Sequence, residues 1–348
     1  MARYVTDDNS SVEFVIAAPT YAKTKKQKRL WKIIGGIVAA IVVIVIVIVI
    51  AVVVTDTKKQ SSKNNNNRGI KEYPISPYSH MTDLVTSNQS SFSQKQRFFV
   101  IGDVHGCVNE LNTLVAKLNY NPTTDQLILA GDLTSKGPDS IGVIRRAKEL
   151  GALCVRGNHD DIVIRFKTYE MEKGRNAMYP LDATMPEGNV PDPLKFKNYH
   201  TAIALNMTDD DYNYLSSCPV MLHLPFLNNS VVVHAGLDPR ISGLENQVPY
   251  LVMTMRDIAS DDIPTSNSRV GTQWAIEYNE FEKNRTIDSL QVFYGHDAGR
   301  GLNIKDMTFG VDTGCVYGGR LTAINIQTKE LVDVVCPTYV NRGDKYDD

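Results

Sequence analysis

The chain has 348 residues, with 37 Lys and Arg against 39 Asp and Glu, so its formal net charge is −2. With 43% hydrophobic and 22% charged residues it has the composition of a globular protein, which excludes a wholly disordered or fibrous chain. Residues 1–94 carry 12 Lys and Arg and 6 Asp and Glu, so residues 95–348 carry a net charge of −8. This acidic larger part argues against a broad basic groove for nucleic acid.

The first predicted element is a transmembrane signal-anchor helix over residues 33–54, a run of 22 residues without a charged or polar side chain. At 1.5 Å of helical rise per residue, the run just exceeds the roughly 30 Å of bilayer hydrocarbon. A buried strand is the alternative, but a strand of this length would be unusual. Six basic residues crowd residues 23–32 and fewer follow the run. The positive-inside rule therefore predicts a cytosolic basic tail (residues 1–32) and a catalytic part on the lumenal side.

Residues 55–94 are rich in Ser, Thr and Asn and are predicted to be a flexible lumenal stalk. Glycosylation sequons at Asn88, Asn206, Asn228 and Asn284 fit a lumenal glycoprotein. The five cysteines contain no C-x-x-C pair, which argues against a disulfide framework or a structural zinc site, although one pair can still form.

From residue 95 onward, apolar strands alternate with helices. Strands are predicted at 98–101, 126–130 and 152–155, and helices are predicted near 111–118 and 141–150. These intervals fit two β-α-β crossovers with parallel strands. The carboxyl ends of parallel strands meet at one edge of a sheet, where open α/β folds place their sites.

Each of these strands, and two later ones at 231–233 and 292–294, ends in a polar cluster. In chain order the clusters supply Asp103 and His105, Asp132, Asn158 and His159, His234, and His296. Carboxylate and imidazole groups in this number suit two divalent ions of the Zn, Mn or Fe type rather than Mg or Ca. The remaining histidines, His80, His200 and His223, have no supporting motif and are interpreted as structural or exposed.

The motifs together resemble the calcineurin-type metallophosphoesterase family from about residue 97 to 336. They are GDVHG (102–106), GD (131–132), GNHD (157–160), HAG (234–236) and GH (295–296). The resemblance implies an α/β fold, a β-sandwich flanked by helices and built on β-α-β-α-β units. We place this domain at residues 95–337 and expect it to end in a hairpin of strands 322–326 and 331–335. A tail follows at residues 338–348.

Two details separate the chain from ordinary protein Ser/Thr phosphatases, which carry G-D-x-x-D-R-G. Ser135 replaces the second Asp, and Lys136 replaces the Arg, which removes a bidentate phosphate fork but keeps its charge. With GHDAGRGL (295–302) and DTGCVYGGRLTA (312–323), the chain resembles the ApaH-like branch, and within it the fungal vacuolar zinc-dependent endopolyphosphatases.

The resemblance also implies roles for individual residues. Asp103 and His105 would hold a first metal ion, Asp132 would bridge to a second, and Asn158, His234 and His296 would complete the second site. The ions, Zn first and Mn, Co or Fe as alternatives, would activate a hydroxide for in-line attack on phosphorus. His159 would be the general acid, oriented by Asp160, and Lys136, Arg256 and Arg300 would bind the substrate.

The expected function is therefore a membrane-anchored phosphoanhydride hydrolase, most simply an endopolyphosphatase of the vacuole membrane or lumen that cleaves inorganic polyphosphate. A Ser/Thr protein phosphatase or a symmetrical diadenosine tetraphosphate hydrolase could share every metal ligand. A non-catalytic membrane scaffold is the alternative from another class, but a scaffold need not keep the intact set of metal and acid residues. No protein partner can be inferred from the sequence.

Overall fold

The computed structural model describes residues 72–179, 183–283, 285 and 289–343, all within one compact unit. The basic tail, the predicted span at 33–54, the first part of the predicted stalk and the sequon at Asn284 lie outside the described residues. Within the described ranges, no helix combines the length and apolarity that a membrane crossing requires.

The first of two large sheets carries the predicted β-α-β units. Its five strands, in order, are β14 (Leu331–Val335), β13 (Arg320–Asn325), β2 (Arg97–Ile101), β3 (Asp125–Leu129) and β4 (Leu153–Cys154). Strands β2, β3 and β4 are parallel, as predicted, whereas β13 runs antiparallel to both β2 and β14. The predicted C-terminal hairpin is therefore part of this sheet.

The second sheet contains the other two predicted strands. Its order is β1 (Leu84–Thr86), β5 (Met221–Leu224), β6 (Ser230–Val233), β10 (Gln291–Tyr294), β12 (Thr308–Gly310) and β11 (Asn303–Ile304). Strands β6 and β10 are parallel. Side chains from both sheets form one buried cluster, including Val100 and Ile128 from the first sheet and Val232 and Phe293 from the second. The two sheets thus pack face to face as the predicted sandwich.

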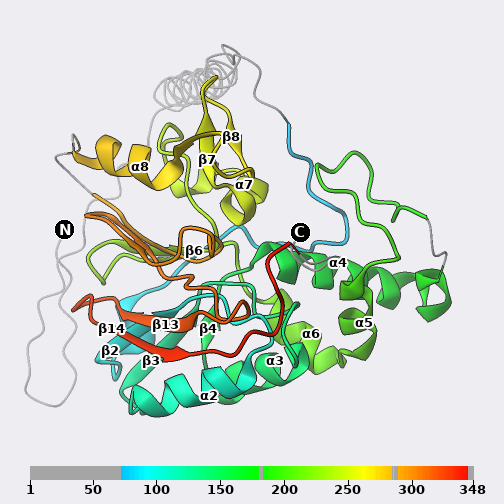
Figure 1. The fold of residues 1–348 in the computed structure, drawn as a ribbon, viewed down its shortest axis with the longest axis horizontal. Coiled ribbons are helices and arrows are strands. Elements are labelled where there is room, and N and C mark those ends of the chain that lie inside the picture. Colours follow the sequence, from blue (N-terminus) through cyan, green and yellow to red (C-terminus); the bar gives the residue numbers. More distant parts are fainter. Residues whose placement is uncertain (1–71, 180–182, 284, 286–288, 344–348) are drawn as a thin grey trace, which may run out of the picture. The chain divides into compact units, whose positions relative to one another are not determined.

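Helices cover both outer faces of the sandwich (Figure 1). The first sheet shares a core with α2 (Val108–Lys117), α3 (Ser140–Glu149), α4 (Asn158–Lys173), α5 (Tyr199–Asn206) and α6 (Asp209–Ser216). The second sheet packs against α7 (Pro249–Thr254), α8 (Trp274–Lys283) and a small sheet of β8 (Pro264–Thr265), β7 (Asp257–Ala259) and β9 (Gly271–Gln273). Burial on both faces explains why the central strands are nearly continuous apolar runs.

The stalk prediction was wrong for residues 72–94, which belong to the folded domain. Tyr78 is buried and its ring meets that of Tyr169 edge-on at 5.1 Å. Strand β1 extends the second sheet, with Leu84 opposite Met221. Composition suggested a stalk because a three-residue edge strand has too little periodicity to stand out among Ser and Thr.

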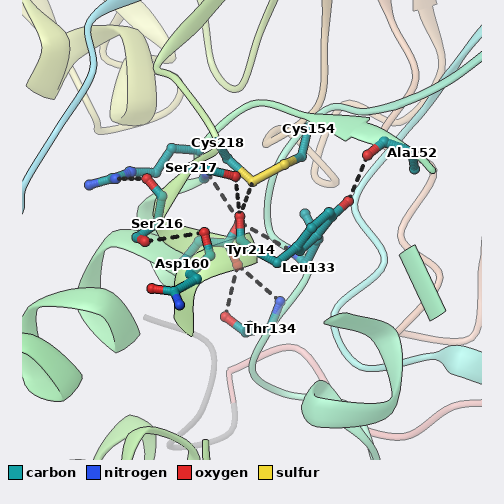
Figure 2. Close-up of a disulfide and its surroundings, with 12 residues drawn as sticks. Leu133, Thr134, Ala152, Cys154, Asp160, Tyr214, Ser216, Ser217 and Cys218 are labelled. Carbon is teal, nitrogen blue, oxygen red and sulfur yellow. Dashed lines mark hydrogen bonds between the residues drawn. A yellow bond between two sulfur atoms is a disulfide. The ribbon is translucent and has the colours of Figure 1, made fainter. Parts of the chain in front are cut away.

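Two disulfides cross-link the domain, where the sequence suggested at most one. Cys154 in β4 is bonded to Cys218 after α6, as Figure 2 shows, and Cys315 is bonded to Cys336. Cys107 is free and buried. The first disulfide ties the strand that leads into α4 to the helical layer outside it, and so restrains the start of α4, where Asn158 and His159 lie.

Candidate metal centre

The polar clusters at the strand ends meet at one edge of the sandwich, as predicted. The nitrogen and oxygen ligand atoms of Asp132, His234 and His296 lie within 4.8 Å of one another, and so do those of His105, Asp132 and His159. Asp132 belongs to both groups, the position expected of a carboxylate that bridges two ions. Asp103 lies 4.0 Å from Nε2 of His105. Oδ1 of Asn158 lies 3.0 Å from Nε2 of His234.

Backbone amides orient the two carboxylates. The N–H of His296 donates to Oδ1 of Asp103 at 3.0 Å, and the N–H of His159 donates to Oδ1 of Asp132 at 3.0 Å. These bonds hold each carboxylate against a loop from another strand end. The fold therefore fixes the acids before any ligand binds.

Three histidines share one arrangement that fixes their tautomers. Nδ1 of His105 lies 2.9 Å from the Thr134 carbonyl, Nδ1 of His234 lies 2.8 Å from the Ala130 carbonyl, and Nε2 of His296 lies 3.0 Å from the Thr254 carbonyl. A carbonyl oxygen only accepts hydrogen bonds, so each of these nitrogens carries the proton. In the neutral ring the other nitrogen then has a lone pair, and in each case it is directed at the centre.

Nitrogen and oxygen ligand atoms thus crowd the centre. Burial lowers the pKa of His234, but Asp132 and Asp103 outweigh it and raise that pKa to about 9, so a metal ion bound there would replace the Nε2 proton. Nε2 of His234 faces Asn158 Oδ1, Nδ1 of His296 at 3.2 Å and Asp132 Oδ2 at 3.4 Å. Imidazole nitrogens held by backbone carbonyls, together with carboxylates, form the donor set of transition-metal sites. These residues therefore fit divalent metal ions.

The electrostatics of the carboxylates agree with this donor set. Burial and the neighbouring Asp312 carboxylate raise the pKa of Asp103 well above its usual range. Burial would also raise the pKa of Asp132, but the positive charge of His234 outweighs it and holds that pKa well below its usual range. Three buried acids this close together repel one another, and a bound cation would relieve the repulsion. The sequence contained a signal for Asp312, because it lies two residues after the end of β12, as Asp103 lies two residues after the end of β2.

Backbone strain gathers at the same place. His105, Asp132, Ser135, Lys136 and His296 all adopt positive φ values, between 44° and 74°. Such conformations are unfavourable for residues other than glycine, and they tend to mark functional sites.

His159 differs from the three histidines above. Its Nδ1 lies 2.9 Å from Nε2 of His200, which was interpreted as structural or exposed, and 3.4 Å from the Tyr199 hydroxyl. Burial and Lys136 lower the pKa of His159 well below its usual range, so the resting ring is neutral.

The prediction that Asp160 orients the ring of His159 was wrong. The Asp160 carboxylate accepts hydrogen bonds from the amides of Leu133, Thr134 and Gly157 and from the Thr134 hydroxyl, at 2.8 to 3.2 Å. It points back from the first turn of α4 and anchors the loop after Asp132 (Figure 2). Its side chain therefore fixes the metal loop rather than the general acid.

The three predicted substrate cations lie in different environments. The Lys136 amine lies 2.9 Å from the Tyr317 hydroxyl, and among the described residues no carboxylate lies within ion-pair distance of it. Arg256 donates only to the carbonyls of Ser266 and His296 in the hydrogen bonds that the described residues show. Both charges remain available to an anion.

Arg300, in contrast, is already neutralised. Its guanidinium pairs with Asp257 at 2.6 Å and with Asp297 at 2.5 Å. It would have to give up both ion pairs to reach a phosphate. The sequence could not show this, because Asp257 lies 43 residues away along the chain.

The sandwich and the paired metal-ligand groups at its edge define the class of protein: a metallophosphoesterase. The calcineurin-like phosphoesterase profile matches residues 96–336, and the chain belongs to that family, in the ApaH-like branch of the phosphoprotein phosphatase superfamily. The family is one of metal-dependent phosphohydrolases, which implies divalent metal ions here.

Relatives and a solved structure support the same assignment. The chain is 30% identical over 249 residues to the asymmetrical bis(5'-nucleosyl)-tetraphosphatase PrpE of Oceanobacillus iheyensis, covering 68% of this chain and 90% of the relative. It is 26% identical over 285 residues to a symmetrical bis(5'-nucleosyl)-tetraphosphatase of Coxiella burnetii, covering 68% of this chain and 91% of the relative. The crystal structure of a protein assigned as a diadenosine tetraphosphatase aligns with TM-score 0.58 and 30% identity, over 73% of this chain and 98% of that one.

Proposed function

We propose that the protein is a metal-dependent hydrolase of phosphoanhydride bonds. The observation that carries the proposal is the set of three histidines, His105, His234 and His296, each locked by a backbone carbonyl and aimed at shared carboxylates. The relatives named for bis(5'-nucleosyl)-tetraphosphatase activity support this type of bond.

In this proposal the residues act as follows. Asp103, His105 and Asp132 would hold one ion, and Asp132, Asn158, His234 and His296 would hold the other. Two bound divalent ions would lower the pKa of a water molecule and neutralise phosphate oxygens.

His159 gives the proton to the leaving oxygen. Because burial and Lys136 lower the pKa of His159, its protonation depends on the substrate's negative charge, which enters beside Lys136 and offsets that cation. Lys136 and Arg256 bind non-bridging phosphate oxygens. A phosphate leaving group needs less help from an acid than an alkoxide does.

Inorganic polyphosphate, cleaved internally with zinc as the ion, is the first candidate substrate. Lys136 and Arg256 offer free positive charge close to the bond that is cleaved, without a long basic groove. This arrangement fits a polyphosphate chain that is bound only near the cleaved bond.

A diadenosine polyphosphate is the second candidate, and a specific cavity favours it. A hollow of about 350 Å³ lies between Lys136 and Tyr199, and Pro138, Ile141 and Ile203 give part of its lining an apolar character. An apolar wall beside a phosphate-binding lysine suits a nucleoside better than a phosphate chain.

The test is a substrate and metal matrix with the full-length protein. The protein is stripped with a chelator, reloaded with Zn, Mn, Co, Fe or Mg, and given long-chain polyphosphate, diadenosine tetraphosphate and a phosphoserine peptide. Hydrolysis of either anhydride at a rate well above that of the phosphoserine peptide supports the proposal. The anhydride that is hydrolysed faster decides between the two candidate substrates. Preference for the peptide, or no metal-dependent turnover at all, would refute the proposal.

We also propose that the domain is lumenal and glycosylated, on a single N-terminal membrane anchor in the vacuole. Asn88, Asn206 and Asn228 are all exposed, and two disulfides suit an oxidising compartment. Endoglycosidase treatment should increase the gel mobility of the protein from sealed vesicles only after a detergent exposes the lumen. Removal of the domain by protease from intact vesicles would contradict this orientation.

A further inference from the structure

The feature that the metal centre leaves unexplained is the contact of His159, in the first turn of α4, with His200, at the start of α5. His200 is 2% exposed and lies outside the ligand set. Its ring stacks on that of His159, with centroids 5.1 Å apart and planes inclined by 22°, and its Nε2 lies 2.9 Å from Nδ1 of His159.

The direction of this hydrogen bond follows from Asn198. The backbone N–H of His200 lies 3.0 Å from Oδ1 of Asn198, and because an amide N–H only donates, the Asn198 atom there is the oxygen. Nδ1 of His200 lies 2.5 Å from the same oxygen and therefore carries a proton. Burial lowers the pKa of His200 to about 3, so the ring is neutral and its Nε2 has a lone pair.

The proton in the contact between the two rings must then come from His159. Since Nε2 of His200 can only accept, Nδ1 of His159 donates, which leaves Nε2 of His159 as the nitrogen that can face the substrate. The order Asn198, His200, His159 thus fixes both tautomers without a carboxylate.

The segment that carries Asn198 and His200 is firmly held. Phe196, just before α5, packs against Phe166 and Tyr169 of α4, with centroids 6.3 and 5.3 Å apart. Glu187 is buried and pairs with Arg165 of α4 at 2.6 Å. α5 is therefore anchored to the same helix whose first turn contains His159, which keeps the relative position of the two rings fixed.

Ser135 does not take this part. It stands where protein Ser/Thr phosphatases carry the second Asp of G-D-x-x-D-R-G, and its hydroxyl lies 3.4 Å from Nδ1 of His105. The hydrogen-bond partner of Nδ1 of His159 therefore comes from another element of the fold, helix α5.

We propose that His200, fixed by Asn198, is the positioning residue of His159: its Nε2 accepts the hydrogen bond from Nδ1 of His159 and so leaves Nε2 of His159 facing the leaving oxygen. The inference rests on the proposed function for the role of His159 as the acid. Nε2 of the neutral ring takes a proton from solvent when the substrate's negative charge offsets Lys136, and this proton moves to the leaving oxygen when its bond to phosphorus breaks. The attacking water supplies the new oxygen on phosphorus and releases a proton to solvent, while Nδ1 of His159 keeps its own proton in the hydrogen bond to His200.

Leaving-group dependence tests the proposal kinetically in the full-length protein. With phenyl phosphate, His200→Ala should lower kcat about 10- to 100-fold with little change in KM, the usual range for losing the partner of a functional histidine. With p-nitrophenyl phosphate, whose leaving group needs no proton, the loss should be less than about threefold. His200→Gln should restore part of the activity, because its side-chain oxygen can accept from Nδ1.

Thr201→Val serves as the matched control. It removes a hydrogen bond of α5 to the Phe196 carbonyl without touching His159. It should act like the wild type with the two substrates. An equal loss for both substrates in His200→Ala, or the same selective loss in Thr201→Val, would overturn the proposal.

A second measurement does not depend on activity. Long-range ¹⁵N–¹H spectra of the seven histidines report which ring nitrogen carries the proton, and the His159→Gln variant identifies the His159 signal. We expect His159 to be protonated on Nδ1 in the wild type and to lose this preference in His200→Ala. Protonation on Nε2 in the wild type would refute the inference. If the wild type hydrolyses no phosphate compound, the proposed function fails while this spectrum still decides the tautomer.

Discussion

The close approach of Gly157 to Asp132 gives the sharpest prediction about the centre. Gly157 has φ −85° and ψ 167°, a conformation that alanine adopts freely, so Gly157→Ala adds no backbone strain. A Cβ atom at this position would, however, lie 2.1 Å from Oδ1 and 2.2 Å from the amide nitrogen of Asp132. The substitution therefore acts on the bridging carboxylate and its loop.

The size of the effect follows from the distance. Ordinary contact begins at 3.4 Å, so Asp132 and the strand end must separate by about 1.3 Å. A displacement of about 1 Å at a reacting centre costs roughly 100-fold in rate, and overpacking of a tight site costs about 1–3 kcal/mol of stability. We expect at least a 100-fold loss of kcat in a protein that still folds.

The assay compares turnover, bound metal after dialysis and thermal unfolding. Gly299→Ala is the matched control, since its Cβ would meet its neighbours at 3.6 Å or more. The control should keep its activity and metal, whereas Gly157→Ala should lose both while the unfolding transition stays cooperative. A folded Gly157→Ala protein with wild-type metal content and turnover would refute the idea that this approach holds Asp132 in place.

Three further outcomes are expected. Asp132→Asn should bind both metal ions at least 10-fold more weakly, because the shared carboxylate loses its charge; equilibrium dialysis measures this. Arg97→Leu should cost about 1 kcal/mol at pH 7, since Arg97 is partly exposed and the pKa of Asp125 is lowered by the hydrogen bond from Arg97 despite its burial. That contribution is present above the unfolded pKa of about 3.9 and disappears as pH falls through the lower folded pKa, so urea unfolding should show the two proteins converging below about pH 4. Replacing both Cys154 and Cys218 by Ala should cost about 2–4 kcal/mol, given their separation of 64 residues, and thermal unfolding under non-reducing conditions checks it.

The sequence was most informative where a candidate ligand residue comes soon after the end of a strand. Asp103, Asp132 and His234 each come within three residues of the end of a buried apolar strand. Since parallel strands end at one edge of a sheet, the positions of these residues along the chain were enough to predict that they lie close together.

Features that depend on contacts between distant segments could not be predicted. His200 reaches His159 across 41 residues, and Cys218 reaches Cys154 across 64. Nothing in the local sequence signals these pairs, because the segment between α4 and α5 has no periodic pattern to fix its path. The charge of Arg300 was misleading partly for the same reason: Asp297 is a local partner three residues away, but Asp257, 43 residues away, is brought to Arg300 by the fold.

The chemistry of each histidine in this centre is decided by the partner of its second nitrogen. A carbonyl behind His105 can only accept, and burial lowers the pKa of this ring to about 4, so Nδ1 keeps its proton and Nε2 turns a lone pair toward the centre, as a metal ligand must. Behind His159 the partner is instead a neutral imidazole, whose Nε2 accepts the hydrogen bond from Nδ1 and leaves Nε2 of His159 facing the substrate. In the proposed function, four histidines of one centre, alike in type and burial, thus divide into three that would bind metal and one that would exchange a proton.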